Sequence, residues 1–309
     1  MRITAPSFRL RTAYHVAFSP DSRLVAAVGR DVVWWSVPER RRLGSSRVPS
    51  NPSAAAFTSD GRTLVVKNTT GEFLTCDTTT GDTLARYAPR GRDEGADPVI
   101  APDGWIVDGS WNGVIRRRDV ASLTPTEVWR DDRTMVIGVL CGGNTWAFVL
   151  RTRVGTSQPD GSPLNGRILL SRAPLQGQFD EMERRWAHLR SAALSPLGDR
   201  LAVRSGATDP VVEIVDVRSG ASLASSTSSF GGTGFDLAWS PDGQYMVLIE
   251  DRAFSIRETD TLREIRVVNS EHPASAAFSP DGRLLALGSW SDGIVTSLAS
   301  VLASPDARG

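Results

Sequence analysis

The chain has 309 residues, of which 40% are hydrophobic and 23% charged, so it can bury a core and lacks the composition of a disordered protein. Its 35 basic residues are balanced by 35 acidic ones. It shows neither the basic stripe of a nucleic-acid binder nor the basic amphipathic helix of a membrane-surface protein, so we expect no nucleic acid and no membrane among its partners.

Lysine is nearly absent: Lys67 is the one lysine among the 35 basic residues, and the others are arginines. This bias is typical of a GC-rich, bacterial genome, and it leaves Lys67 as the one candidate for lysine-based catalysis. Two cysteines, Cys76 and Cys141, cannot build a disulfide framework and are expected to be reduced thiols. Residues 1–14 lack the apolar stretch of a signal peptide, and no run approaches the roughly 18 apolar residues of a membrane span. The sequence predicts a cytoplasmic protein.

The first predicted element is a strand at Phe8–Thr12, which has no hairpin partner next to it. After it, a short apolar run followed by a turn of Ser, Pro, Asp and Gly type recurs seven times, with a period of roughly 40 residues. A second apolar run follows each turn, which indicates a β-hairpin because Pro fixes φ and Asp and Gly tolerate turn geometry. The copies are AFSPDS from Ala17, AFTSDG from Ala56, VIAPDG from Val99, VLCGGN from Val139, ALSPLGD from Ala193, AWSPDG from Ala238 and AFSPDG from Ala277.

A third predicted strand follows each hairpin. When the copies are aligned on its centre, the residue three positions earlier is β-branched or aromatic in all seven, and such residues favour strands. The centres are Trp35, Cys76, Arg118, Ser171, Val215, Arg257 and Leu298, and the earlier positions are Val32, Phe73, Ile115, Ile168, Val212, Phe254 and Val295.

A more polar fourth strand is predicted after the third one, for example at Thr83–Tyr87, Thr126–Trp129, Glu183–Trp186, Ser222–Ala224 and Leu262–Val267. The seventh copy lacks this strand, so the unpaired strand at Phe8–Thr12 is predicted to complete it, which closes a ring and hides two sheet edges. The densest basic cluster, Arg40–Arg42, then falls on a solvated outer strand. No segment has the pattern of a helix.

These elements predict an all-β fold, a single seven-bladed β-propeller that spans residues 1–309 with four antiparallel strands per blade. The blades are predicted to begin near residues 15, 53, 97, 135, 190, 235 and 274, and residues 8–12 are predicted to close blade 7.

The segment Gly109–Ser122, GSWNGVIRRRDVAS, resembles the signature of the WD-repeat family, and AFSPDG is similar to the first hairpin of that repeat. The resemblance covers about residues 3–302. The Trp place of the signature holds Trp in one copy, and the Gly-His pair of the family is absent. Trp35 fills the Trp place, and the Asp place is acidic at Asp77, Asp119, Asp216 and Glu258. The chain is therefore similar to bacterial propellers with degenerate repeats, and the resemblance implies a scaffold that holds protein partners.

Residues that carry chemistry are scarce. Three histidines, His15, His188 and His272, are too few for a His-rich metal site, and no further ligand accompanies them. The predicted inner strands are small and apolar, and their one acidic residue, Asp236, cannot act as both acid and base. The glycine-rich segment Gly231–Gly234 does not open a helix and is predicted to connect two blades. We expect no catalytic residue, no metal and no cofactor.

One rim of the predicted ring, which carries the connections between blades and between second and third strands, varies most from copy to copy. It includes Pro89–Pro98, Ser226–Gly234 and an insertion at Arg151–Gly166, and polar loops on a rigid scaffold often carry function. Trp111 and Trp290 lie at matching places beside this rim, and Trp and Arg are common interface anchors. The predicted partner-binding residues are Trp111, Trp290, Arg130, Arg133, Arg151 and Arg153. The competing interpretation is that each indole packs over its own turn and that the insertion is merely tolerated.

The sequence thus predicts a non-enzymatic protein-interaction scaffold, and mixed charges on the varied rim favour a protein partner. Propellers also host enzymes, so the fold does not decide the function. Two alternatives stay open: a propeller enzyme of the hydrolase, lyase or lactonase type with its site at the channel mouth, and a sensor or carrier of a small molecule.

Overall fold

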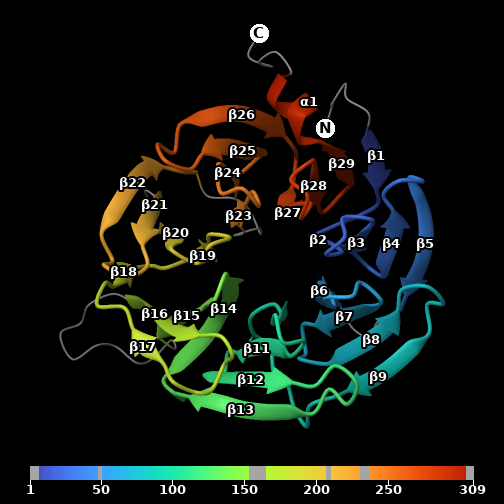
Figure 1. Cartoon of the computed structure of the whole chain (residues 1–309), viewed down its shortest axis with the longest axis horizontal. Coiled ribbons are helices and arrows are strands. Elements are labelled where there is room, and N and C mark those ends of the chain that lie inside the picture. The colour runs from blue at the N-terminus through green and yellow to red at the C-terminus, as the bar shows by residue number, and fades with distance from the viewer. Residues whose placement is uncertain (1–6, 48–50, 153–164, 207–209, 230–236, 304–309) are drawn as a thin grey trace.

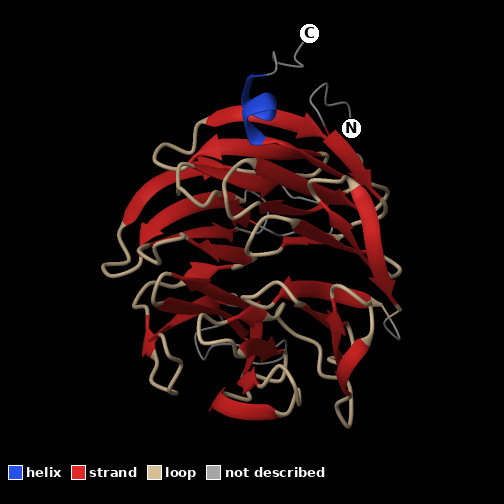
Figure 2. Ribbon diagram, turned by 45° about the vertical axis from the view of Figure 1, so that its right-hand side comes forward, coloured by secondary structure: helices blue, strands red, loops and turns tan. Residues whose placement is uncertain are grey.

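The computed structural model of the chain describes residues 7–47, 51–152, 165–206, 210–229 and 237–303. Seven antiparallel sheets surround a central axis, and in each sheet the strands follow one another outward from that axis (Figure 1). The turned view in Figure 2 places the one described helix at the outer edge of the ring. The predicted all-β, seven-bladed propeller is confirmed.

We number the sheets as blades 1 to 7. Blade 1 contains β2 (His15–Phe18), β3 (Leu24–Val28), β4 (Val32–Ser36) and β5 (Arg41–Ser46). Blade 2 contains β6 (Pro52–Phe57), β7 (Thr63–Asn68), β8 (Phe73–Asp77) and β9 (Thr83–Tyr87). Blade 3 contains β10 (Val99–Ile100), β11 (Ile106–Ser110), β12 (Val114–Arg118) and β13 (Pro125–Arg130).

Blade 4 contains β14 (Thr134–Gly142), β15 (Thr145–Thr152), β16 (Asn165–Arg172), β17 (Asp180–Glu181) and β18 (Trp186–Ala187). Blade 5 contains β19 (Ser191–Leu194), β20 (Arg200–Ser205), β21 (Val211–Asp216) and β22 (Ser222–Thr227). Blade 6 contains β23 (Leu237–Trp239), β24 (Tyr245–Ile249), β25 (Ala253–Glu258) and β26 (Glu264–Asn269). Blade 7 contains β27 (Pro273–Phe278), β28 (Leu284–Ser289), β29 (Gly293–Ser297) and β1 (Ser7–Leu10), and α1 (Leu298–Ala303) follows β29.

The recurrent Ser-Pro-Asp-Gly sequence closes the first hairpin turn of a blade. In blade 1, Ser19 Oγ donates to Asp21 Oδ1 at 2.6 Å and accepts the N–H of Leu24 at 2.8 Å, while Asp21 Oδ1 accepts the N–H of Arg23 at 3.0 Å. The same bonds recur at Thr58 and Asp60, at Ser240 and Asp242, and at Ser279 and Asp281. Because the hydroxyl and the carboxylate satisfy turn amides that would otherwise lack partners, the repeat requires these residue types.

The acidic place after the third strand caps a second turn. Asp77 Oδ1 accepts the N–H groups of Thr79 at 2.7 Å and Thr80 at 2.9 Å, and these bonds hold the pKa of Asp77 below its ordinary value. Asp119 and Asp216 accept turn amides in the same way. The position that resembles the WD-repeat Asp is therefore used to shape the connection between the third and fourth strands.

The core is distributed as seven clusters of buried apolar side chains among the described residues, one between each pair of neighbouring blades. The β-branched or aromatic column of the third strands lies in these layers. Its members Val32, Phe73, Ile115, Ile168, Val212 and Phe254 are 0% exposed, and Val295 is 2% exposed. Each blade is thus held by its two neighbours, so every pairwise packing layer is needed to keep the ring closed.

The ring closes through the N-terminal strand. The structure confirms that this strand completes the last blade, although it spans Ser7–Leu10 instead of Phe8–Thr12. It pairs antiparallel with β29, with Ser7 opposite Thr296 and Leu10 opposite Gly293, and Figure 1 shows the two strands side by side. The outer edge of β29 is therefore covered by a segment from the other end of the chain.

The outer strand of blade 4 is interrupted. The sequence predicts one strand at Glu183–Trp186, and this prediction is wrong, because β17 and β18 pair separately with β16 and the residues between them leave the sheet. Arg184 turns instead to blade 5, where its Nη2 lies 2.6 Å from Glu213 Oε1 and its Nη1 donates to Gly220 O at 3.1 Å. Side-chain bonds between blades here replace backbone pairing within one blade.

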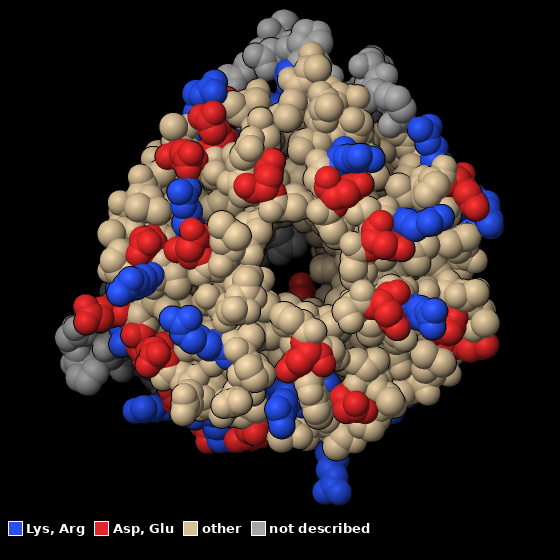
Figure 3. Space-filling model, in the orientation of Figure 1, with Lys and Arg blue, Asp and Glu red and all other residues tan. Residues whose placement is uncertain are grey.

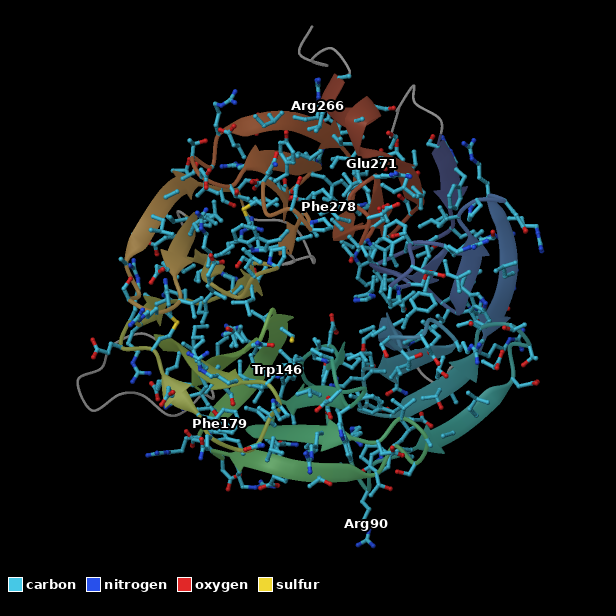
Figure 4. All side chains as sticks on the ribbon, viewed as in Figure 1. Arg90, Trp146, Phe179, Arg266, Glu271 and Phe278 are labelled. Atoms are coloured by element: carbon cyan, nitrogen blue, oxygen red, sulfur yellow. The ribbon has the colours of Figure 1, made fainter. Side chains whose placement is uncertain are left out.

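The end of blade 7 also differs from the prediction. The sequence predicts a third strand centred on Leu298 and no helix, but β29 ends at Ser297 and α1 begins at Leu298. Leu298 and Val301, one helical turn apart, are buried at the layer between blades 6 and 7. Arg266 of β26 donates from Nε to Val301 O at 3.1 Å and so satisfies a carbonyl at the end of the helix. Figure 4 shows Arg266 at the outer edge of the ring, next to α1.

Candidate functional site

Trp111 lies in the turn between β11 and β12, on the rim that carries the connections between blades. The backbone N–H of Trp111 donates to Glu94 O at 2.7 Å. Gly113 in the same turn has φ +76°, and a Cβ there would lie 2.0 Å from Asp131 O, so only glycine fits. The backbone is thus clamped between the loops that precede and follow it, while the indole is 39% exposed. An exposed indole on a rigid base is suited to anchoring a partner.

A hollow of about 480 Å³ lies beside this turn. Asp93 and Arg116 form an ion pair in it, and their side chains are 12% and 15% exposed. Partial burial acts to raise the pKa of Asp93, but hydrogen bonds from Arg116 and Ser110 outweigh it and hold that pKa below its ordinary value. The hollow is lined by Pro89, Gly91, Arg92, Asp93, Asn112, Val114, Arg116, Arg130 and Asp132.

Two of the arginines predicted to bind a partner, Arg130 and Arg133, lie in this region and differ in how strongly their guanidinium groups are paired. Arg130 is held by Glu127, with Nε–Oε1 and Nη2–Oε2 distances of 3.0 and 2.6 Å, and its Nη1 donates to Asp132 at 2.9 Å. Arg133 is 84% exposed, and its Nε lies 3.5 Å from Asp131 Oδ1. Arg90, in the loop before the hollow, extends away from the ring in Figure 4. Arg130 is therefore largely neutralised, whereas Arg133 can meet a partner.

The structure separates Trp290 from Trp111. Trp290 lies in the turn between β28 and β29 of blade 7, three blades from blade 3 around the ring. Its ring stacks on Tyr14 with centroids 4.9 Å apart, and it is 49% exposed. The backbone N–H of Trp290 donates to His272 O at 3.1 Å. Trp290 and Tyr14 join blade 7 to the segment that leads into blade 1, so the two tryptophans do not form one patch.

The other predicted residues lie in or near the insertion of blade 4. Arg151, near the end of β15, is partly buried, and this burial together with the neighbouring Arg190 lowers its pKa. Arg153 lies outside the described residues, as do residues 154–164 of the insertion. Arg151 is thus a strand residue beside the next blade, and the structure does not join it to Trp111.

His15 is enclosed at the start of β2. Its Nε2 lies 3.8 Å from Asp97 Oδ2, and its Nδ1 accepts the N–H of Ala55 at 3.4 Å. Burial lowers the pKa of His15, and the charge of Asp97 opposes this shift. The imidazole therefore connects blade 1 to the two blades that follow. Asp236, the predicted inner-strand carboxylate, lies outside the described residues.

Lys67 lies in the layer between blades 2 and 3, where the apolar cluster has four fully buried members. The side chain is 1% exposed, and its Nζ donates to Ala96 O at 2.7 Å and to Gly109 O at 3.3 Å. Asp108 Oδ2 lies 4.0 Å from Nζ and also binds Arg118, whose Nε donates to Oδ1 at 2.8 Å. Burial lowers the pKa of Lys67. These polar bonds tie the two blades together where apolar packing is sparse.

In the described part of the chain, no group of three or more His, Cys, Asp or Glu side chains could hold a metal ion. None of the helices in that part is long and apolar enough to cross a membrane. Cys76 and Cys141 are free thiols, and burial raises the pKa of both, that of Cys141 to about 11.

A larger groove of about 580 Å³ lies on the opposite rim, between the first hairpin turns of blades 5 and 6. The first hairpin turns on that rim are short and similar from copy to copy in the sequence. One departure in the sequence could have indicated the groove: the turn of blade 5 has Leu197 where the others carry an acidic residue or glycine.

On the face shown in Figure 3 the ring axis opens to the surface, and acidic and basic side chains are intermingled around the opening.

No protein-family model matches the chain, and a search of curated proteins gives no sequence match. A comparison with solved structures finds 1701 matching chains, so a structural likeness by itself does not select a function. One of them is the hydrazine synthase of Kuenenia stuttgartiensis, which superposes with a TM-score of 0.75 over 96% of this chain and 97% of that chain, at 16% sequence identity. A likeness at this identity shows the propeller fold alone.

Proposed function

We propose that the chain is a WD-repeat-like propeller that acts as a protein-interaction platform. The partner would bind the blade 3 rim surface, which comprises Arg92, Trp111, Asn112, Arg130 and Arg133. The observation that carries the proposal is the combination of a clamped backbone and an exposed indole at Trp111, beside a hollow of about 480 Å³. A rigid aromatic anchor loses little conformational freedom on binding, which favours affinity.

The charges around Trp111 support a protein partner. Arg130 is paired with Glu127 and Asp132, and Arg116 is paired with Asp93, so the surface offers both signs in fixed positions. Nucleic acids would require a continuous basic surface. Fixed pairs of opposite charge instead favour a partner with complementary charges around an apolar centre.

The experiment compares capture of the partner by three forms of the tagged chain in lysate of its source organism: the wild type, Trp111→Ala combined with Arg133→Glu, and Leu84→Ala. Leu84 is a matched control, because it is 55% exposed on the outer strand β9, away from the rim. We expect a partner that the wild type and Leu84→Ala retain and the rim variant loses. In a titration with that purified partner, loss of the Trp111 anchor should cost about 2 kcal/mol, or roughly thirtyfold in affinity.

All three forms should show the same thermal melt, because neither Trp111 nor Arg133 is buried. A rim variant that folds normally and retains every partner of the wild type would refute the proposed surface.

A further inference from the structure

The groove on the opposite rim has an apolar wall that is unusual for a surface turn. Trp239, Tyr245 and the prolines Pro196 and Pro241 line it together with Leu197. Leu197 is 78% exposed, the largest value among the large hydrophobic side chains of the described residues. The equivalent position in the first hairpin turn of every other blade is Asp or Gly, so the turn itself does not require a leucine.

The turn of blade 5 keeps its geometry while it replaces the usual carboxylate. In the turn of blade 6, Ser240 Oγ donates to Asp242, two residues later. In blade 5, Ser195 Oγ donates instead to Asp199, four residues later, at 2.8 Å, and accepts the N–H of Arg200 at 3.0 Å. The position two residues after the serine, which is Asp in blade 6, is Leu197. The capping carboxylate has moved along the chain, which leaves the tip of the turn for an apolar side chain that points into solvent.

The turn is held rigidly. On its other side a Cβ at Gly142 would lie 2.1 Å from Ser195 O, and one at Gly143 would lie 2.5 Å from Leu197 O, so the blade 4 turn packs directly on the backbone that carries Leu197. On the groove side, Trp239 Nε1 donates to Ala193 O at 3.0 Å, which fixes the indole between the two blades. Rigid apolar groups at a surface lower the entropy cost of binding a ligand.

The groove is acidic. Its charged lining consists of the four carboxylates Asp199, Asp242, Glu258 and Asp260 and the guanidinium of Arg200, and Arg263, outside the lining, lies 3.4 Å from Glu258, which leaves two net negative charges. Arg200 is already paired, with Nη1 2.6 Å from Asp260 Oδ1. Carboxylates along the walls of a concave surface attract cations more strongly than scattered surface charges do.

We propose that this groove is a second binding site, and that it takes a peptide segment that carries arginine or lysine next to apolar side chains. The cationic groups would meet the carboxylates, and an apolar side chain would pack on Leu197 between the proline, tryptophan and tyrosine walls. A small cation would satisfy the charge and leave Leu197 exposed, and an apolar ligand would leave the carboxylates unmatched. The site lies on the rim opposite to the blade 3 rim surface, so it does not depend on the function proposed for that surface.

Fluorescence anisotropy with a short, capped, fluorescein-labelled peptide of alternating leucine and arginine tests the proposal. We expect the wild-type chain to bind it saturably, and binding to weaken when salt is raised from about 0.05 M to about 0.5 M, because salt screens the carboxylates. Leu197→Asn should weaken binding by about tenfold or more, since it removes the apolar contact. Asn suits such a turn and adds no charge, so the melt should be unchanged.

Two further variants and two further peptides complete the experiment. Leu84→Asn removes an exposed leucine outside the groove and should leave the affinity unchanged. Asp260→Asn removes one carboxylate and frees Arg200, so it should weaken binding by severalfold. Peptides with serine for leucine or with glutamate for arginine should bind about tenfold more weakly or not at all.

The proposal is overturned if the leucine–arginine peptide does not bind, if the glutamate or serine peptide binds as well, or if Leu197→Asn binds like the wild type. Self-association of the chain that Leu197→Asn abolishes would assign the groove to a second copy and would also overturn it. Variants of the blade 3 rim surface should bind the peptide like the wild type, which separates this outcome from the fate of the proposed function.

Discussion

Ring closure by β1 can be tested at a single side chain. Leu10 is 3% exposed and packs with Ala13, Val16 and Val295 in the layer between blades 7 and 1. Leu10→Ala removes three buried carbons, and at about 0.8 kcal/mol for each the transfer cost is about 2.4 kcal/mol. The cavity adds to this cost, whereas relaxation of a short edge strand reduces it. We expect a loss of about 2 to 3 kcal/mol in the free energy of unfolding.

Thermal melting followed by circular dichroism measures this loss. At roughly 2 °C per kcal/mol for a domain of this size, the melting temperature should fall by about 5 °C. Leu84→Ala is the control, since its side chain is 55% exposed and the change should stay within about 0.5 kcal/mol. If Leu10→Ala melts like the wild type, β1 does not hold the ring closed and the seam between blades 7 and 1 is stable without it.

Three further predictions concern the layers between blades. Lys67→Met should lower the free energy of unfolding by about 2 to 3 kcal/mol in urea titrations, because two buried carbonyls lose their donor; an unchanged midpoint would show that the ammonium is dispensable. Burial lowers the pKa of His15 in the folded chain, so the unfolded chain takes up the proton first as the pH falls. The contribution of His15 to the free energy of unfolding should be fully present above pH 6.5 and be lost as the pH drops through the lowered pKa. His15→Asn should flatten this part of the stability–pH profile. Trp290→Ala should lower the free energy of unfolding by about 1 kcal/mol through lost stacking on Tyr14 and should leave partner binding intact, as calorimetry and a binding titration can show together. A loss of binding without a loss of stability would show that Trp290 contacts the partner.

The architecture could be predicted because the same positions in each repeat must meet the same packing and turn requirements. A buried third-strand position tolerates only residues that fill the layer between blades, so the column from Val32 to Val295 shows the period even where the turn sequences diverge. The N-terminal strand was predictable for a related reason: seven third strands and six fourth strands leave one edge that only Phe8 and its neighbours can cover.

Features that depend on contacts between repeats were not predictable in this way. The outer strand of blade 4 is broken where Arg184 binds Glu213 of the next blade, and no local pattern shows that pairing. The helix α1 forms where Leu298 and Val301 can pack on blade 6 and Arg266 can bind its end. Local propensity in a six-residue segment does not decide between strand and helix when such tertiary contacts are available.

The candidate site was predictable only in part. Trp111 and its neighbours in blade 3 could be identified from their residue types and their place on the varied rim. Sequence spacing could not show that Glu127 and Asp132 neutralise Arg130 or that Trp290 stacks on Tyr14. The opposite groove required knowing that two turns from different blades face each other, although the unusual Leu197 was visible in the sequence.

Hydrogen exchange of the chain with and without its captured partner locates the binding surface on the ring, because it reports which backbone amides the partner covers. We expect slower exchange in residues 89–97, 110–113 and 131–134, which surround Trp111, and unchanged exchange on the outer strand β9. Protection confined to the outer strands, or to the turns of blades 5 and 6, with no change around Trp111, would contradict the claim that the rim of blade 3 binds the partner.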